Sequence, residues 1–256
     1  MTTYGVLGVG SIAEAIVTGL CSVDAPPEVV LSPRNAERSA RLAARFATVR
    51  VADDNQAVVD AADVVVVCLL PQQADVLAGL AFRPEHRVVS AVAGLSMARL
   101  GELVAPATEV ARSVPLPAVA TRSSTTPIHP PRSVAEDLYS LLGGTLPVED
   151  ERAYESLSAA SATVAAHLDY LGTIAAWVGG HGIEDAQARK YVADLFADLA
   201  PELRTPGVDF ADLAAAHSTP GGLNAQLAAH LRDAGLLDAL RSGLDDLLDR
   251  IAPRGA

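Results

Sequence analysis

The chain has 256 residues, half of them hydrophobic, and a formal net charge of −12. A general nucleic-acid surface needs clustered lysine and arginine, so this acidic balance excludes a nucleic-acid-binding protein. No signal peptide is recognised and no apolar run reaches the length of a membrane span, which predicts a cytoplasmic protein with no membrane partner.

The first predicted element is a strand over residues 4–7 that leads through a glycine turn into a helix. Gly8 permits the sharp turn, Gly10 lets the backbone approach a pyrophosphate, and Ala13 takes the small third position of a dinucleotide-binding fingerprint. Ser11 is expected to cap the helix, whose amino-terminal N–H groups would face the phosphates. A glycine triplet alone is weak evidence, but a strand before it and a helix after it favour a dinucleotide site.

A second strand over residues 28–31 ends at a polar tip that precedes a helix over residues 36–46. An acidic residue at this tip would bind the adenosine ribose hydroxyls, whereas an arginine with small polar neighbours suits a 2′-phosphate. The tip holds Ser32, Arg34 and Asn35 and no acid, which predicts NADP(H) as the cofactor. The alternative is that Arg34 is a solvated loop charge.

Strands and helices continue to alternate up to residue 114. The apolar run over residues 63–70 is typical of a strand buried on both faces of a parallel sheet, and it ends at Pro71, where ligands of such sheets bind. Further strands are expected over residues 49–52, 87–92 and 109–114, and helices from residue 54 and over residues 73–80 and 96–103. This alternation predicts an α/β fold, a Rossmann-type doubly wound sheet.

Beyond residue 149 the pattern becomes helical, with helices expected over residues 151–166, 167–178, 185–203 and 223–251. The chain is therefore expected to divide into an NADP-binding domain, residues 1–149, and an all-α domain, residues 150–256. The second domain is expected to serve dimerisation and substrate binding. Its helices are apolar on most faces, which predicts burial in a homodimer or a higher homo-oligomer.

One segment of the helical part, residues 216–227, combines hydroxyl groups, a proline and two glycines before a helix. The N–H groups of Gly221, Gly222 and Leu223 could form an anion cradle at the helix start. The alternative is an ordinary helix start, with Thr219 as the cap and Pro220 in the first turn.

These features together resemble the pyrroline-5-carboxylate reductase family, over nearly the whole chain. The resemblance is carried by the glycine turn, the Ser-Pro-Arg-Asn tip, Asp54-Asn55, the strand that ends at Pro71-Gln72, Ala93-Gly94, Arg112 with Pro115, and residues 218–222. It implies a Rossmann domain, an interlocked helical dimer, and reduction of pyrroline-5-carboxylate to proline with NAD(P)H.

The resemblance also implies a role for individual residues. The pyrophosphate would be held by Gly8, Gly10, Ser11 and Ile12; the 2′-phosphate by Ser32, Arg34 and Asn35; the adenosine side by Asn55; and the nicotinamide half by Leu69, Pro71, Ala93 and Gly94. The substrate would be bound by Thr219, Gly221, Gly222 and Leu223, with Asn224 as the catalytic residue near the imine nitrogen.

Three departures from the family pattern surround the expected substrate. Leu70 stands where the family has lysine, Leu116 where it has asparagine, and Leu223-Asn224 where it has two threonines. These changes leave three hypotheses open: a pyrroline-5-carboxylate reductase, a reductase of a more apolar imine, and a non-catalytic NADP-binding sensor. A deazaflavin-dependent reductase on the same fold is weaker, because Arg34 with Ser32 favours an adenosine 2′-phosphate.

The remaining polar residues give weaker signals. The histidines lack metal-ligand spacing, so no metal site is predicted. His217, two residues before Thr219, is a candidate proton source, with a helix-end histidine as the simpler interpretation. Cys68 is expected to be a small core side chain rather than a reactive thiol.

Overall fold

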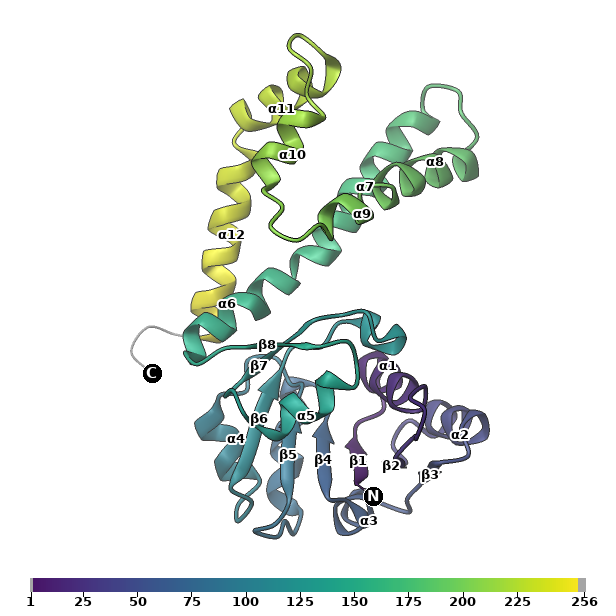
Figure 1. The fold of residues 1–256 in the computed structure, drawn as a ribbon, viewed down its shortest axis with the longest axis vertical. Coiled ribbons are helices and arrows are strands. Elements are labelled where there is room, and N and C mark those ends of the chain that lie inside the picture. The colour runs from purple at the N-terminus through teal and green to yellow at the C-terminus, as the bar shows by residue number, and fades with distance from the viewer. Residues whose placement is uncertain (1, 253–256) are drawn as a thin grey trace. The chain divides into compact units, whose positions relative to one another are not determined.

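The structure is a computed structural model that describes residues 2–252. By the contacts within the chain it separates into two compact units, drawn in Figure 1. The first unit runs to Ser158 and takes in the chain again from Leu248, and the second covers Ala159–Leu247. The division of roles between a cofactor domain and a dimerisation domain, with its boundary at residue 149, stays a prediction.

The first unit contains a sheet in which the described residues form eight strands, in the order β3-β2-β1-β4-β5-β6-β7-β8 (Figure 1). Strands β1 to β6 are parallel, β7 runs antiparallel to β6, and β8 is parallel to β7. Because β1 lies between β2 and β4, the order reverses there, which makes the carboxyl edge near β1 a ligand-binding position. The strands are β1 Thr3–Leu7, β2 Glu28–Leu31, β3 Val49–Val51, β4 Val64–Val67, β5 Arg87–Ser90, β6 Glu109–Ser113, β7 Thr126–His129 and β8 Thr145–Pro147.

Strand β4 is buried on both faces, as its sequence predicts. Val64 and Val66 belong to the apolar cluster on one side of the sheet, together with Ile16 of the helix after β1. Val65 and Val67 belong to the cluster on the other side. Because side chains alternate along a strand, this one run of valines contributes to the apolar clusters on both faces of the sheet. The predicted α/β fold, a doubly wound Rossmann-type sheet with a helical carboxyl-terminal part, is confirmed.

The helices of the first unit have the predicted order but shorter bounds. The segment expected as a helix over residues 73–80 is a 3₁₀ helix that begins with Pro71, and β4 ends at Val67 rather than at residue 70. The elements are α1 Ser11–Leu20, α2 Ala36–Arg45, α3 Asn55–Ala61, η1 Pro71–Gly79, α4 Met97–Leu103, η2 Pro117–Thr121, α5 Val134–Ser140 and α6 Glu151–Ser161.

A buried ion-pair cluster holds the start of α6 against β6. Arg112, 1% exposed, pairs with Glu155, 2% exposed, and its Nη1 donates to Glu151 Oε1 over 2.8 Å. The guanidinium also lies 4.7 Å from the centre of the Tyr154 ring. Burial raises the pKa of the Tyr154 phenol, so this ring stays neutral beside the cation. Glu151 Oε1 accepts a second bond, from the Met97 N–H, which connects α6 to the start of α4.

The second unit is helical throughout its described elements, and α7 packs against α8. The helix expected over residues 223–251 is divided by Gly235, which has a φ of +79°, and the chain between α9 and α11 holds a helix that the sequence did not predict, α10. The helices are α7 Thr163–Gly179, α8 Asp185–Ala197, α9 Ala200–Leu203, α10 Phe210–Ala216, α11 Leu223–Asp233 and α12 Leu236–Ile251. Within residues 2–252, no helix is long and apolar enough to cross a membrane.

Candidate functional site

The glycine turn after β1 has little room for side chains. Gly8 has a φ of +87°, and a Cβ at this position would lie 2.7 Å from the carbonyl oxygen of Cys68 and 2.9 Å from Leu69 Cδ2. A Cβ on Gly10, by contrast, would meet no atom of the chain within 4 Å. Gly8 is thus required by the fold, whereas the space over Gly10 is open to a ligand. The open space beside Gly10 fits the close approach of a pyrophosphate.

The start of α1 leaves backbone donors available. Gly10, and not Ser11 as expected, is the N-cap residue, and it makes no side-chain capping bond. Ser11 is the first residue of the helix, and its Oγ accepts a bond from Arg38 Nη1 over 3.3 Å. Uncapped N–H groups at a helix start are a preferred position for phosphate. Ile12, in the same turn, is half-buried.

The polar residues of the tip after β2 have two different roles: two of them make structural hydrogen bonds, and one is exposed. Ser32 is buried, and its Oγ accepts a bond from the Gly8 N–H over 3.0 Å. Asn35 caps α2 and donates from Nδ2 to the Val9 carbonyl over 3.1 Å. Arg34 is exposed and forms no ion pair with any described residue. Ser32 and Asn35 therefore position the turn and the tip, and Arg34 is the residue of this group that is free to meet a phosphate.

Arg38 is a residue near this site that the sequence analysis missed. It lies one turn into α2, bonds Ser11, and pairs through Nε with Glu14 Oε2 over 3.3 Å. It thus places a guanidinium group, paired with Glu14, beside the start of α1. The signal was its spacing of three residues from Asn35, which places both on the first turn of one helix.

We predict that Arg34→Ala weakens NADPH binding while NADH binding stays unchanged. A hydrogen bond to a charged group contributes about 1.5–3 kcal/mol, so the dissociation constant for NADPH should rise about 10- to 150-fold. Fluorescence titration with each nucleotide measures the effect. Arg45→Ala, at the other end of α2, removes the same charge and serves as the control. Equal loss for NADPH and NADH would mean that Arg34 does not contact the 2′-phosphate.

Asn55, expected on the adenosine side, is the first residue of α3 and is half-buried. The helix start is fixed by Asp54, whose Oδ1 accepts a bond from the Ala57 N–H over 2.8 Å. A capped first turn holds its backbone in one conformation. Asn55 is thus presented from a rigid helix start beyond β3.

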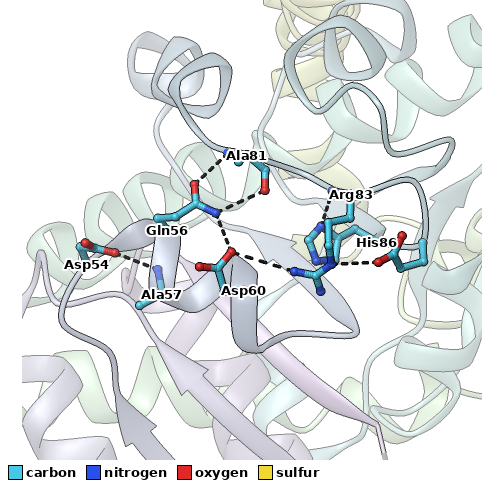
Figure 2. Close-up of polar contacts among 8 residues, drawn as sticks. Asp54, Gln56, Ala57, Asp60, Ala81, Arg83 and His86 are labelled. Atoms are coloured by element: carbon cyan, nitrogen blue, oxygen red, sulfur yellow. Dashed lines mark hydrogen bonds and ion pairs between the residues drawn. The ribbon is translucent and has the colours of Figure 1, made fainter.

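Figure 2 shows a polar network formed by residues of α3 and of the segment that follows η1. Gln56 makes two bonds with the backbone of Ala81, accepting over 2.7 Å and donating over 3.2 Å, and its Nε2 also donates to Asp60 Oδ1. The Arg83 N–H donates to His86 Nδ1 over 2.9 Å, and burial lowers the pKa of His86. The network ties α3 to the segment before β5.

The residues expected to hold the nicotinamide half lie after two neighbouring strands, β4 and β5. Leu69 is 9% exposed, so it can present only its backbone and one edge of its side chain, whereas Pro71 and Ala93 are exposed. Gly94 has a φ of +69°. Because β1, β4 and β5 are adjacent, Gly8, Leu69 and Ala93 follow neighbouring strands at one carboxyl edge.

Cys68 lies beneath this edge. Burial raises the pKa of its thiol to about 12, so at neutral pH it is uncharged and carries little nucleophilic thiolate. Within the described residues, no group of three His, Cys, Asp or Glu side chains could hold a metal ion.

In the structure, one of the three N–H donors predicted for the anion cradle of the helical unit is already used. Gly222 is the N-cap of α11, and its N–H donates to the Thr219 carbonyl over 2.9 Å, so this group is not available to an anion. The alternative with Thr219 as the cap is also wrong, because α11 has no side-chain cap. Gly221 has a φ of +74°, and Leu223 is 84% exposed. The backbone donors left for an anion are those of the first turn of α11.

Asn224, expected to be catalytic, lines a pocket of about 590 Å³ within the helical unit. Its Nδ2 donates to the His217 carbonyl over 2.7 Å, which leaves Oδ1 as the side-chain atom that can bind a ligand. His217 also lines the pocket, and its Nε2 lies 2.9 Å from Glu202 Oε2. The other lining residues are Leu195, Phe196, Asp198, Leu199, Leu203, Phe210, Leu213 and Ala214. The remaining expected substrate residues, Thr219, Gly221, Gly222 and Leu223, are not among them.

Comparison with known proteins agrees with the fold and with the predicted class of enzyme. The family model described as an NADP oxidoreductase, coenzyme F420-dependent, matches residues 3–94. A pyrroline-5-carboxylate reductase from Corynebacterium melassecola is 29% identical over 223 residues, which are 81% of this chain and 82% of that protein. The 1-pyrroline-5-carboxylate reductase structure from Streptococcus pyogenes is 25% identical, with a TM-score of 0.83 over 98% of both chains. Over most of its length the chain is similar to pyrroline-5-carboxylate reductases, at modest identity.

A more distant structure extends the fold comparison. The Plasmodium falciparum pyrroline carboxylate reductase, solved with NADP bound, is 14% identical and has a TM-score of 0.80, over 100% of this chain and 98% of that one. It shows that the fold is kept when most residues differ. The fold of these reductases therefore extends over both units of this chain.

Proposed function

We propose that this chain transfers a hydride from NADPH to a cyclic imine, and that pyrroline-5-carboxylate, which would give proline, is the first substrate to test. The chain is an NADP(H)-dependent oxidoreductase. The observation that carries the proposal is Asn224, whose amide lies in the wall of a pocket with Oδ1 unused by the bond to His217.

The residues of the first unit that fit the cofactor do so by shape and charge. The open space at Gly10 and the uncapped start of α1 suit the pyrophosphate, and the exposed Arg34 suits the 2′-phosphate. When bound, NADPH supplies the hydride. The work left to the protein is mainly to orient the substrate, because a protonated imine is already electrophilic at carbon.

Asn224 would orient that substrate. The N–H of a protonated imine is a donor, and Asn224 Oδ1 is an acceptor, so the bond between them would fix the ring nitrogen. The substrate carboxylate would face the backbone donors at the start of α11. Asn224 would then take the place of the family threonine near the imine nitrogen.

A second candidate, a reductase of a more apolar imine, is favoured by the pocket lining. Leu199, Leu203 and Phe210 form apolar walls, and the acidic side chains of Asp198 and Glu202 also line the pocket. Neither acidic group attracts a substrate carboxylate. A carboxylated imine would therefore depend on backbone donors, whereas an uncharged or cationic imine would not.

The test measures NADPH oxidation with pyrroline-5-carboxylate and with a panel of cyclic imines that have and lack a carboxylate. Turnover is predicted to fall about 10- to 100-fold in Asn224→Ala, because a well-placed hydrogen bond to a charged group contributes about 1.5–3 kcal/mol. Gln226→Ala, an exposed residue two positions further along α11, is the control.

The outcomes separate the candidates. Turnover of pyrroline-5-carboxylate that is lost in Asn224→Ala supports proline formation. Turnover of uncarboxylated imines alone assigns the enzyme to a more apolar substrate. NADPH binding without turnover of any imine would favour a non-catalytic NADP-binding sensor.

We also propose that the chain acts as a homodimer or a higher homo-oligomer through its helical unit. Trp177 and Tyr191 are 65% and 63% exposed in the single chain, which is unusual for such large apolar groups. Association of two copies would cover them. Sedimentation velocity tests this proposal, and a monomer at micromolar concentration would contradict it.

A further inference from the structure

The pocket of the helical unit contains an acid–base pair that is not needed for the positioning described above. His217 Nε2 lies 2.9 Å from Glu202 Oε2, and the two side chains are 48% and 45% exposed. Glu202 belongs to α9, and His217 follows the last residue of α10. The pair thus joins two helices across the pocket that Asn224 also lines.

The backbone fixes His217 at this position. Its N–H donates to the Leu213 carbonyl over 3.1 Å, and its carbonyl accepts the bond from Asn224 Nδ2 over 2.7 Å. The Asn224 amide is therefore bonded to the backbone of the residue that carries the imidazole. Both residues line the same pocket, so a ligand bound there can contact both side chains.

The contact with Glu202 determines which ring nitrogen exchanges a proton. An ionised carboxylate only accepts hydrogen bonds, so Nε2 carries a hydrogen in both states of the ring. Nδ1 is then the atom that gains or loses the proton. Nδ1 has no hydrogen-bond partner in the described part of the chain. The half-exposed ring can also regain its proton from solvent.

An imine that binds in its neutral form must receive a proton to become the protonated imine described above. A neutral imine receives a hydride at carbon and a proton at nitrogen, and Asn224 cannot supply the proton because an amide does not titrate near neutral pH. The titratable groups that line the pocket in the described structure are Asp198, Glu202 and His217. Of these side-chain types, imidazole alone normally titrates near neutral pH.

We propose that His217, oriented by Glu202, donates the proton from Nδ1 to the imine nitrogen; this rests on the proposed imine reduction. The Nδ1–H bond breaks as the N–H bond of the product forms. With the hydride that bound NADPH would supply, the new C–H bond would form as the electron pair of the C=N double bond moves to nitrogen. The products are the amine, NADP⁺ and neutral His217, which takes a proton from water. His217 is thus a catalytic residue and Glu202 a positioning residue.

The experiment compares two substrates that differ in their need for a proton. One is a neutral cyclic imine, used at a pH above its own pKa, and the other is its N-methylated iminium counterpart, which is already cationic. His217→Asn should lower kcat for the neutral imine about 100-fold or more, the usual contribution of general acid catalysis, and change kcat for the iminium less than about twofold. Glu202→Gln, which keeps an acceptor for Nε2, should give a smaller loss in the same pattern.

The control is His230→Asn in the last turn of α11, which should leave both substrates unaffected. NADPH titration of each variant checks that the protein is folded. Equal losses on both substrates, or no loss on either, would overturn the role of His217 while imine reduction stands. Failure of the unmodified enzyme to reduce either substrate would overturn the proposed function and the role of His217 with it.

Discussion

Arg112→Ala is expected to lower the stability of the first unit by about 3–5 kcal/mol, the usual cost of removing one partner of a buried ion pair. Glu155 is 2% exposed and would lose its buried cationic partner. Glu151 and Tyr154 would also lose their contacts with the guanidinium. Hydrogen exchange at the amides of β6 measures the loss within this unit, without assuming that both units unfold together.

The matched control replaces the pair with apolar groups of similar volume. Arg112→Met with Glu155→Leu leaves no isolated charge, so the double variant should be more stable than Arg112→Ala by about 2 kcal/mol or more. The Glu151 bond to the Met97 N–H would remain. If the double variant is as unstable as the single one, packing rather than charge dominates this cluster.

Gly8→Ala is expected to impair both folding and NADPH binding. The left-handed backbone at a φ of +87° costs about 1–2 kcal/mol for alanine. The contact of the new Cβ with the Cys68 carbonyl, 2.7 Å away, adds about 1–3 kcal/mol of overpacking. Thermal unfolding with and without NADPH measures both effects. An unchanged melting temperature would contradict the geometry of the turn.

Gly10→Ala is the control for this variant, because a Cβ there meets no atom of the chain within 4 Å. The residue has a φ of −91°, which alanine adopts without strain. The variant should therefore keep its stability and lose affinity for NADPH, since the methyl group occupies space that the pyrophosphate needs. If Gly10→Ala matches the unmodified protein in both stability and affinity for NADPH, the phosphates do not approach Gly10.

The alternation of strands and helices in the first unit could be predicted because each element depends on local patterns. The valines of β4 have neighbours of their own kind on both sides, so burial on both faces follows from the run itself. The glycine turn can also be recognised from local sequence, because Gly8, Gly10 and Ala13 lie within six residues. Local steric rules are enough to recognise such segments.

The parts that could not be predicted depend on contacts between distant residues. Ser32 resembled a phosphate ligand in the sequence, but the pairing of β1 with β2 buries it beneath the glycine turn. The contact of His217 with Glu202 requires α9 and α10 to turn back on each other across residues 204–209. Arg38 reaches Ser11 from another helix. None of these partners is indicated by spacing along the chain.

The hydrogen bond from the Gly8 N–H to Ser32 makes cofactor choice and cofactor affinity interdependent. Ser32 belongs to the segment that an engineer would rewrite to convert an NADPH enzyme into an NADH enzyme. Replacing it would also release the turn proposed to receive the pyrophosphate, so we expect both nucleotides to bind less well. A productive conversion should therefore retain Ser32 and change Arg34, the exposed neighbour that takes no part in holding the turn.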